Sequence, residues 1–163
     1  MAAPYVTAYV ALGANLGDPI ITVRAAIEAL RGLAGARFLA VSSLYRTAPV
    51  GLRDQPDFIN AVATMAVAGS ADDLLADLFA IEAAFGRVRG LKNAPRTLDL
   101  DLLLFGAECR DSPGLTLPHP RLTERAFVLA PLAEIAPTLD INGHGLVSDL
   151  LARVADQRIE RLP

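Results

Sequence analysis

The sequence is poor in the residues that build disulfide frameworks, zinc sites and membrane spans. Cys109 is the only cysteine among 163 residues, which excludes an internal disulfide. Two histidines are too few for a histidine-rich zinc site. No apolar run reaches the roughly 18 residues of a membrane span, and no basic and apolar leader precedes the first predicted strand. We therefore expect a cytoplasmic protein that has no contact with a membrane.

An excess of positive charge and the common nucleotide-binding motifs are also missing. The formal net charge of −3 and the isoelectric point near 5.3 argue against a nucleic-acid partner. The chain has no GxxxxGKS or GxxxxGKT loop, and the GxxxG segment from Gly13 to Gly17 is not a dinucleotide fingerprint. Any nucleotide would therefore be held by another kind of site. With 53% hydrophobic and 20% charged residues, residues 1–163 are expected to fold as one domain.

The hydrophobic pattern predicts alternating strands and helices over the first two thirds of the chain. Expected strands span residues 5–12, 36–46, 57–67 and 95–105, the last one ended by Gly106. One expected helix spans residues 20–33 after an Asp18 N-cap, and a second runs from a capping box at Ser70 to Phe85. The order β-α-β-β-α-β is that of an α+β ferredoxin-like sandwich with an antiparallel sheet.

The remaining residues are expected to form a C-terminal helical and hairpin extension of that sandwich. A loop through Pro118-His119-Pro120-Arg121 leads to a predicted helix over 123–135, which Pro137 stops. A short hairpin around Asn142-Gly143 and a last helix over 147–155 complete the expected structure.

Two carboxylates interrupt the last strand of the predicted sheet. Asp99 and Asp101 are two residues apart, so in a strand their side chains share one face with Leu103 and Phe105. Their Cα atoms would lie roughly 6.5–7 Å apart, which allows the pair to hold one divalent cation or two side by side. The alternative is a pair of solvated aspartates on the open face of a half-exposed strand.

Basic residues flank this acidic pair on both sides in the sequence. They are Arg87, Arg89, Lys92 and Arg96 before the strand, and His119, Arg121 and Arg125 after it. The pattern favours a site for a divalent metal and a polyphosphate together, because guanidinium groups neutralise the phosphate charge that the metal leaves. Taken singly, an arginine such as Arg53 or Arg121 can equally be a solvated surface residue.

The strand over 57–67 offers side chains for a second ligand. Phe58 and Asn60 share one face and combine an aromatic plane with an amide that donates and accepts hydrogen bonds, which suits a flat heterocycle. A core aromatic and a strand-end asparagine would produce the same pattern. Glu82, in the last turn of its predicted helix, is open to two interpretations, a nucleotide contact or a solvated carboxylate.

Six segments, in this order, carry a resemblance to a known family. They are ALGANLGD at 11–18, YRTAP at 45–49, DQPDFIN at 54–60, GRVR at 86–89, PRTLDLD at 95–101 and LPHPR at 117–121. Together, over about residues 5–140, they resemble 6-hydroxymethyl-7,8-dihydropterin pyrophosphokinase of the folate pathway. The PRTLDLD segment is the most specific of the six.

The resemblance implies a magnesium-dependent enzyme that transfers pyrophosphate from ATP to the hydroxymethyl group of 6-hydroxymethyl-7,8-dihydropterin and releases AMP. It implies that Asp99 and Asp101 are ligands of two Mg²⁺ ions and that the catalytic residues are Arg87, Arg96, Asp99 and Asp101. The implied pterin-binding residues are Thr47, Pro49, Val50, Gly51, Phe58, Asn60, Asp99 and Phe127. The implied ATP-binding residues are Glu82, Arg89, Leu102, Thr116, His119 and Arg125. The expected partners are these small molecules, bound by a monomer.

A second interpretation is a non-catalytic ferredoxin-like module that binds pterin or nucleotide. Such a module would be expected to lack one of the four catalytic residues, and all four are present. The chain departs from the family pattern at Phe79 and Gly114, where some members place a polar residue and an arginine that contact the nucleotide.

Overall fold

The computed structural model describes residues 4–49, 54–86 and 97–163, and its centre is an antiparallel sheet. Within the sheet the strand order is β10-β3-β4-β1-β5, and β2 pairs with β4 beside β3. The strands are β1 (Val6–Ala14), β2 (Ala36–Val41), β3 (Tyr45–Thr47), β4 (Phe58–Val67), β5 (Asp99–Phe105) and β10 (Ile159–Arg161). Every pairing in this sheet is antiparallel.

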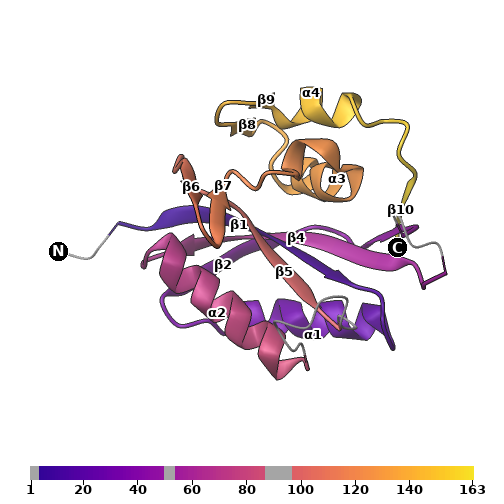
Figure 1. Ribbon diagram of the computed structural model, residues 1–163, viewed down its shortest axis with the longest axis horizontal. Helices are drawn as coiled ribbons and strands as arrows, with labels where there is room; N and C mark the ends of the chain where they lie inside the picture. The colour runs from indigo at the N-terminus through magenta and orange to yellow at the C-terminus, as the bar shows by residue number, and fades with distance from the viewer. Residues whose placement is uncertain (1–3, 50–53, 87–96) are drawn as a thin grey trace.

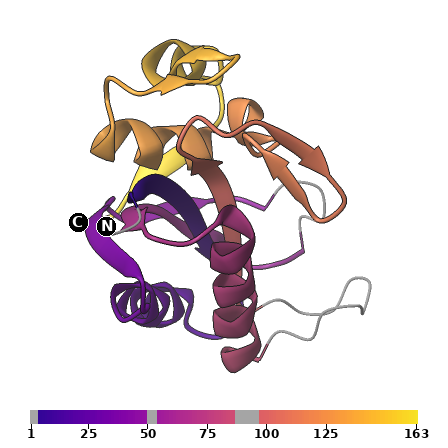
Figure 2. The same ribbon diagram turned by 90° about the vertical axis from the view of Figure 1, so that its left-hand side faces the viewer.

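Helices cover both faces of the sheet (Figure 1, Figure 2). On one face lie α1 (Pro19–Arg31) and α2 (Ala71–Ala84), which complete the predicted β-α-β-β-α-β unit. On the other face α3 (Ala126–Ile135) packs against β4, and α4 (Val147–Ala152) packs against α3. The ferredoxin-like α+β fold and its C-terminal extension are therefore confirmed.

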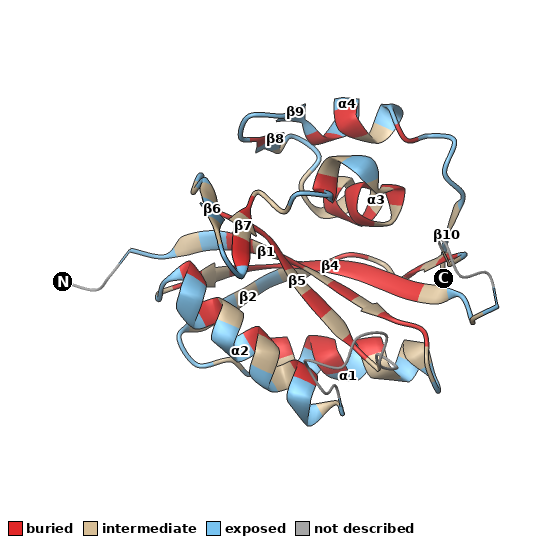
Figure 3. Cartoon of the chain, in the orientation of Figure 1, coloured by how far each residue is buried: buried red, intermediate tan, exposed pale blue. Residues whose placement is uncertain are grey.

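Each face of the sheet carries its own core, and Figure 3 shows the buried positions along the strands. Val10 and Leu12 of β1 belong to the cluster beneath α1 and α2, whereas the alternate residues Tyr9 and Ala11 face α3. Because successive strand residues point to opposite faces, β1 contributes to both cores at once. Within the described residues, no helix has the length and apolar character needed to cross a membrane.

The predicted caps of the first two helices are present. The Ile21 N–H donates to Oδ1 of Asp18 at 3.2 Å, and Pro19 occupies the first turn of α1. At α2, the Asp73 N–H donates to Ser70 Oγ and the Ser70 N–H donates to Asp73 Oδ2, which is a complete capping box. These bonds satisfy N–H groups that have no partner inside the helix.

The single strand expected over 36–46 is wrong, because the chain forms two strands there. Val41 pairs with Ala63 and Tyr45 with Asn60, and the Ser42 N–H donates to the Val62 carbonyl between them. From Ser42 to Tyr45 the chain therefore advances three residues, while β4 advances only two, from Val62 to Asn60. This extra residue is a bulge, which bends the chain and separates β2 from β3.

A second bulge corrects the expected faces of the acidic strand. Along β5, Leu102 pairs with Val10 but Leu104 pairs with Tyr9, so Leu103 is the extra residue. As a result Leu104 joins Leu103 in the core under α3, and Phe105 turns to the opposite core. Asp99 and Asp101 precede the bulge and keep the predicted common face.

Some of the short elements near the C-terminus were not expected from the sequence. A hairpin of β6 (Arg110–Ser112) and β7 (Leu115–Leu117) occupies part of the predicted loop, and β8 (Asp140–Ile141) and β9 (Gly145–Leu146) form the expected small hairpin. The last helix ends at Ala152 rather than at residue 155, and β10 follows it. Elements of two or three residues have too little hydrophobic periodicity to be recognised in a sequence.

One carboxylate connects three elements on the α3 side of the sheet. Glu134 of α3 accepts hydrogen bonds from the Ser43 N–H at 2.9 Å, the Ser43 hydroxyl at 3.1 Å and the Tyr45 hydroxyl at 2.6 Å. Arg161 of β10 lies 3.6 Å from the same carboxylate. Burial raises the pKa of Glu134. The bonds from Tyr45 and Ser43 and the charge of Arg161 lower it by more, so the pKa lies below its ordinary value.

We expect Glu134→Gln to lower the free energy of unfolding by about 1–3 kcal/mol at pH 7, because the amide cannot replace a charged acceptor of several hydrogen bonds. A lowered pKa stabilises the fold above the unfolded-state pKa, and this contribution is lost as the pH falls through the folded-state pKa. In urea denaturation, the free energies of unfolding of the wild type and of Glu134→Gln should therefore converge as the pH is lowered.

The matched control for that measurement is Glu28→Gln, because Glu28 forms an exposed ion pair with Arg31 on the surface of α1. An exposed pair of this kind contributes under about 1 kcal/mol. Equal losses for the two variants at pH 7 would contradict the role given to Glu134.

Candidate active site

Strand pairing places the predicted site residues in two rows across the sheet. Asn60 of β4 pairs with Gly13 of β1, and Gly13 pairs in turn with Asp99 of β5. In the next row on the same face, Val62 pairs with Ala11, which pairs with Asp101. Neighbouring strands are about 4.8 Å apart, so Asn60 and Asp99 face each other over roughly 10 Å.

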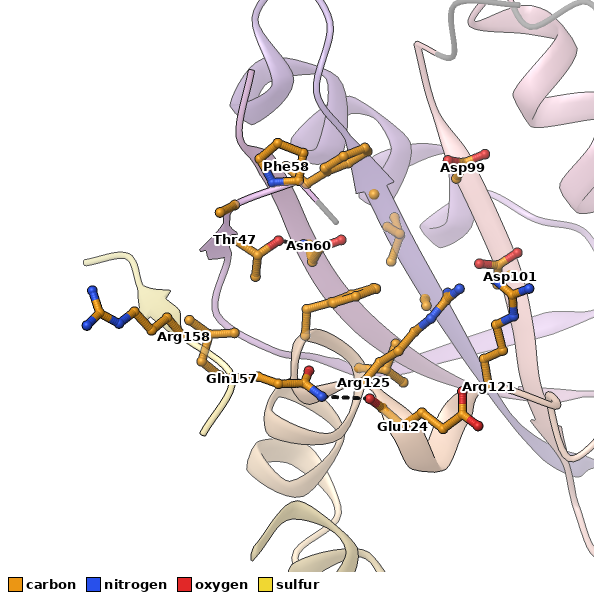
Figure 4. A pocket seen from close by; sticks show the side chains of 18 residues that line it. Thr47, Phe58, Asn60, Asp99, Asp101, Arg121, Glu124, Arg125, Gln157 and Arg158 are labelled. Carbon is orange, nitrogen blue, oxygen red and sulfur yellow. Dashed lines mark hydrogen bonds between the residues drawn. The ribbon is translucent and has the colours of Figure 1, made fainter. Parts of the chain in front are cut away.

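A cavity of about 980 Å³ lies over these rows and beneath the start of α3. Thr47, Phe58 and Asn60 lie on one side of it, opposite Asp99 and Asp101 (Figure 4). The other lining residues include Pro49 of the chain after β3, Phe127 and Val128 of α3, and Gln157, Arg158 and Ile159 near the C-terminus. We call this the acceptor cavity.

Hydrogen bonds fix the polar wall of the acceptor cavity. Asn60 is buried, and its Nδ2 donates to the Thr47 hydroxyl at 2.9 Å. This bond leaves Oδ1 on the side of Gly13, where a Cβ would lie 3.0 Å away from it. At the end of β1, buried Asn15 donates to the Gln55 side chain at 2.9 Å and holds the chain that enters β4.

A second cavity, of about 400 Å³, lies on the other side of β5. Its lining includes Leu102, Thr116 and His119, all of which the resemblance assigns to ATP. Phe79 and Gly114, the two departures from the family pattern, also line it. We call this the nucleotide cavity. It shares Asp99, Asp101 and Arg125 with the acceptor cavity, so the two cavities meet at the carboxylate pair.

Partly buried basic side chains face the carboxylates. Burial lowers the pKa of His119, the charge of Asp101 opposes this, and Arg125 and Arg121 lower it further. Burial likewise lowers the pKa of Arg125, against the opposing effect of Asp101. The guanidinium groups of Arg121 and Arg125 point toward the Asp101 side of the pocket (Figure 4). Among the described residues, none donates a hydrogen bond to Asp101 or forms an ion pair with it.

The donor set suits a magnesium ion better than a zinc ion. In the part of the chain that the structure describes, no group of three His, Cys, Asp or Glu side chains is placed to hold a metal. Mg²⁺ is commonly bound by one or two carboxylates, with water and substrate phosphates as its other ligands. Asp99 and Asp101, on one face and at the boundary of two cavities, fit that requirement.

Glu82 is not the solvated carboxylate that one interpretation of the sequence proposed. It is 1% exposed, and its Oε2 accepts the Leu100 N–H at 2.8 Å, between the two aspartates. It therefore supports β5 from α2, while its contact with a nucleotide stays a prediction. Five other predicted residues, Val50, Gly51, Arg87, Arg89 and Arg96, lie outside the described residues.

The sequence did not identify several residues that line the acceptor cavity. Gly13 was missed because the first strand was expected to end at Leu12, whereas β1 continues to Ala14. Gln157 and Ile159 were missed because they lie just before and at the start of a strand, β10, that has no sequence signal of its own. Gly13, which lies between Asn60 and Asp99 in one row of the sheet, is a signal that a register prediction could have used.

An antiparallel ferredoxin-like sheet with two cavities that meet at paired carboxylates is an arrangement that suits a transferase. Residues 9–137 match the model of the 7,8-dihydro-6-hydroxymethylpterin-pyrophosphokinase (HPPK) family. The chain belongs to this family, and it is a pyrophosphokinase of folate biosynthesis.

Two bacterial relatives agree with this over nearly their whole length. The 2-amino-4-hydroxy-6-hydroxymethyldihydropteridine pyrophosphokinase of Pseudomonas aeruginosa is 48% identical over 155 residues, which are 95% of this chain and 96% of that one. The enzyme of the same name from Haemophilus influenzae is 40% identical over 157 residues, covering 96% and 98% of the two chains.

The fold is also similar to that of solved structures. The HPPK-DHPS A437G protein of Plasmodium falciparum, solved with SDX-DHP, matches 94% of this chain with a TM-score of 0.77 and 13% sequence identity. This chain spans 46% of that longer protein. At this identity the likeness concerns the fold.

We expect Gly13→Ala to reduce turnover by about tenfold while the protein stays folded, because the new methyl group would press on Oδ1 of Asn60. A tenfold loss corresponds to about 1.4 kcal/mol of barrier. Ala8→Gly, in the core on the other face of β1, is the control for a change of strand propensity. Steady-state rates and circular dichroism check both variants, and a Gly13→Ala enzyme of full activity would contradict the close approach.

Proposed function

We propose that the protein transfers pyrophosphate from ATP, with magnesium, to the hydroxymethyl group of 6-hydroxymethyl-7,8-dihydropterin. The observation that carries this proposal is the meeting of the two cavities at Asp99 and Asp101. A transfer between two bound substrates needs their reacting atoms at one place, and positioning together with electrostatic stabilisation accounts for most catalysis of this kind.

The acceptor cavity would hold the pterin. Phe58 and Phe127 come from opposite walls, β4 and α3, and would lie against the two faces of the ring. Asn60, held by Thr47, would bond the edge of the ring, and main-chain groups at Pro49 would complete the pocket. The same role is proposed for Val50 and Gly51.

The nucleotide cavity would hold ATP. His119 and Arg125 would contact the triphosphate, with Leu102 and Thr116 beside the nucleoside. The Arg121 N–H donates to Nδ1 of His119 at 3.2 Å, so Nε2 carries the proton of the neutral ring. We assign further nucleotide contacts to Glu82 and Arg89, and bracing of the phosphates during transfer to Arg87 and Arg96.

The reaction forms one bond and breaks one. The hydroxymethyl oxygen bonds to the β-phosphorus of ATP, the bond from that phosphorus to the α,β-bridging oxygen breaks, and AMP leaves with the bridging oxygen. Asp99, in the row that contains Asn60, would accept the hydroxyl proton. Two Mg²⁺ ions held by Asp99 and Asp101 would neutralise charge on the phosphates.

We further propose that residues 1–163 form a single domain that acts as a monomer in the cytoplasm. Its partners would be the two small-molecule substrates. The second candidate, a module that binds pterin or nucleotide without reacting, predicts binding without turnover.

A coupled assay for AMP tests the proposed function directly. With ATP and Mg²⁺ present, we expect AMP release to depend on added 6-hydroxymethyl-7,8-dihydropterin. Chelation of the metal should abolish it, because the carboxylate pair alone adds negative charge next to the triphosphate. AMP release without the pterin would indicate an ATPase, and its absence under all conditions would favour the binding module.

The carboxylate pair can be tested by a substitution that keeps its shape. We expect Asp101→Asn to lower kcat by at least about 100-fold, which is roughly 2.7 kcal/mol of barrier, because the amide binds a divalent cation weakly. Asp111→Asn is the matched control, since Asp111 is exposed on β6 and lines neither cavity. An Asp101→Asn enzyme within threefold of the wild type would show that the metal is held elsewhere.

A further inference from the structure

A side chain from near the C-terminus holds the start of α3. Arg125 is the N-cap residue of this helix, but its own side chain makes no capping hydrogen bond. Instead the Ala126 N–H, the first of the helix, donates to Oε1 of Gln157 at 2.9 Å. The N–H groups of a first helical turn need partners of this kind.

The same amide makes a second bond on the other side of Arg125. Nε2 of Gln157 donates to the Glu124 carbonyl oxygen at 2.8 Å, the dashed line in Figure 4. The Gln157 side chain thus bonds the main chain immediately before and immediately after Arg125. Two bonds from one planar amide restrict the main chain at Arg125 more than either bond alone.

Gln157 is fixed at a defined place by its own main chain. Its N–H donates to the Val154 carbonyl at 3.0 Å, and Val154 is buried in the core beside α4. Two residues after Gln157, Ile159 pairs with Thr47 in the sheet. The Gln157 side chain is exposed, so its amide is not required to fill the core.

The two main-chain groups that bond this amide lie next to two residues, Arg125 and Phe127, that line the cavities. Arg125 lines both cavities, and Phe127 lines the acceptor cavity. The guanidinium carbon of Arg125 lies 5.3 Å from the centre of the Phe127 ring, within the range of a cation–π contact. A displacement of the helix start would therefore move both side chains.

We propose that Gln157 is a positioning residue of the transfer reaction, which fixes the start of α3 so that Phe127 meets the acceptor and Arg125 meets the triphosphate. The inference rests on the proposed function and adds to it a residue that contacts neither reacting group. It predicts that Gln157 affects the pterin more than the nucleotide, because α3 supplies Phe127 and Val128 to the acceptor cavity, whereas the nucleotide cavity is lined mainly from α2, β5 and β7.

Two substitutions separate the bonds. Gln157→Met keeps the length of the side chain and removes both bonds, whereas Gln157→Glu keeps an acceptor for the Ala126 N–H and loses the donor. By calorimetry with Mg²⁺ and a non-hydrolysable ATP analogue, we expect the Kd of the pterin to rise about fivefold to tenfold for Gln157→Met and less for Gln157→Glu. The Kd of the ATP analogue alone should change by about twofold or less.

A double-mutant cycle tests whether Gln157 acts through the helix start. In a Phe127→Ala background, Gln157→Met should weaken pterin binding by clearly less than it does in the wild type. Glu160→Gln, in the same segment but outside both cavities, is the control and should keep wild-type constants.

Three results would overturn the inference. They are an unchanged pterin Kd in Gln157→Met, an undiminished effect in the Phe127→Ala background, and an equal loss for both substrates together with a lowered Tm. Failure of the proposed function would look different, because the wild-type protein itself would then show neither pterin binding nor AMP release.

Discussion

The candidate site depends on the pairing of one strand, β1, with β4 on one side and β5 on the other. This pairing sets Asn60 and Asp99 in one row with only Gly13 between them. A shift of either pairing by one residue would turn the site residues of that strand toward the opposite core. The buried residues of β1, such as Val10 and Leu12, therefore specify the site without contacting a substrate, because they allow only one register.

The electrostatics of the site favour an anionic ligand. Asp99 and Asp101 lie beside His119 and Arg125, two groups whose pKa burial lowers. Removing a cation from water is unfavourable, and a neighbouring anion stabilises the buried cation. A polyphosphate between these groups would stabilise them more than a single aspartate does. Under the proposed function, binding of the polyphosphate would complete this charge pairing.

The sequence predicted the parts of this molecule that depend on long periodic patterns or on specific caps. Three of the four expected strands, the helices after Asp18 and Ser70, and the common face of Asp99 and Asp101 could be recognised because their signals are local. The bulges at Ser43 and Leu103 could not, since an extra residue in a strand depends on how the partner strand pairs. The fixation of α3 by Gln157 was missed for a similar reason, because it joins residues about thirty positions apart.

The sharing of Asp99, Asp101 and Arg125 between two cavities has a thermodynamic consequence. Two ligands that contact the same side chains do not bind independently, so a coupling free energy connects them. That coupling is reciprocal, and whatever factor the nucleotide applies to the affinity of the pterin, the pterin must apply to that of the nucleotide. Under the proposed function, substitutions at those three residues are therefore expected to alter the dissociation constants of both substrates.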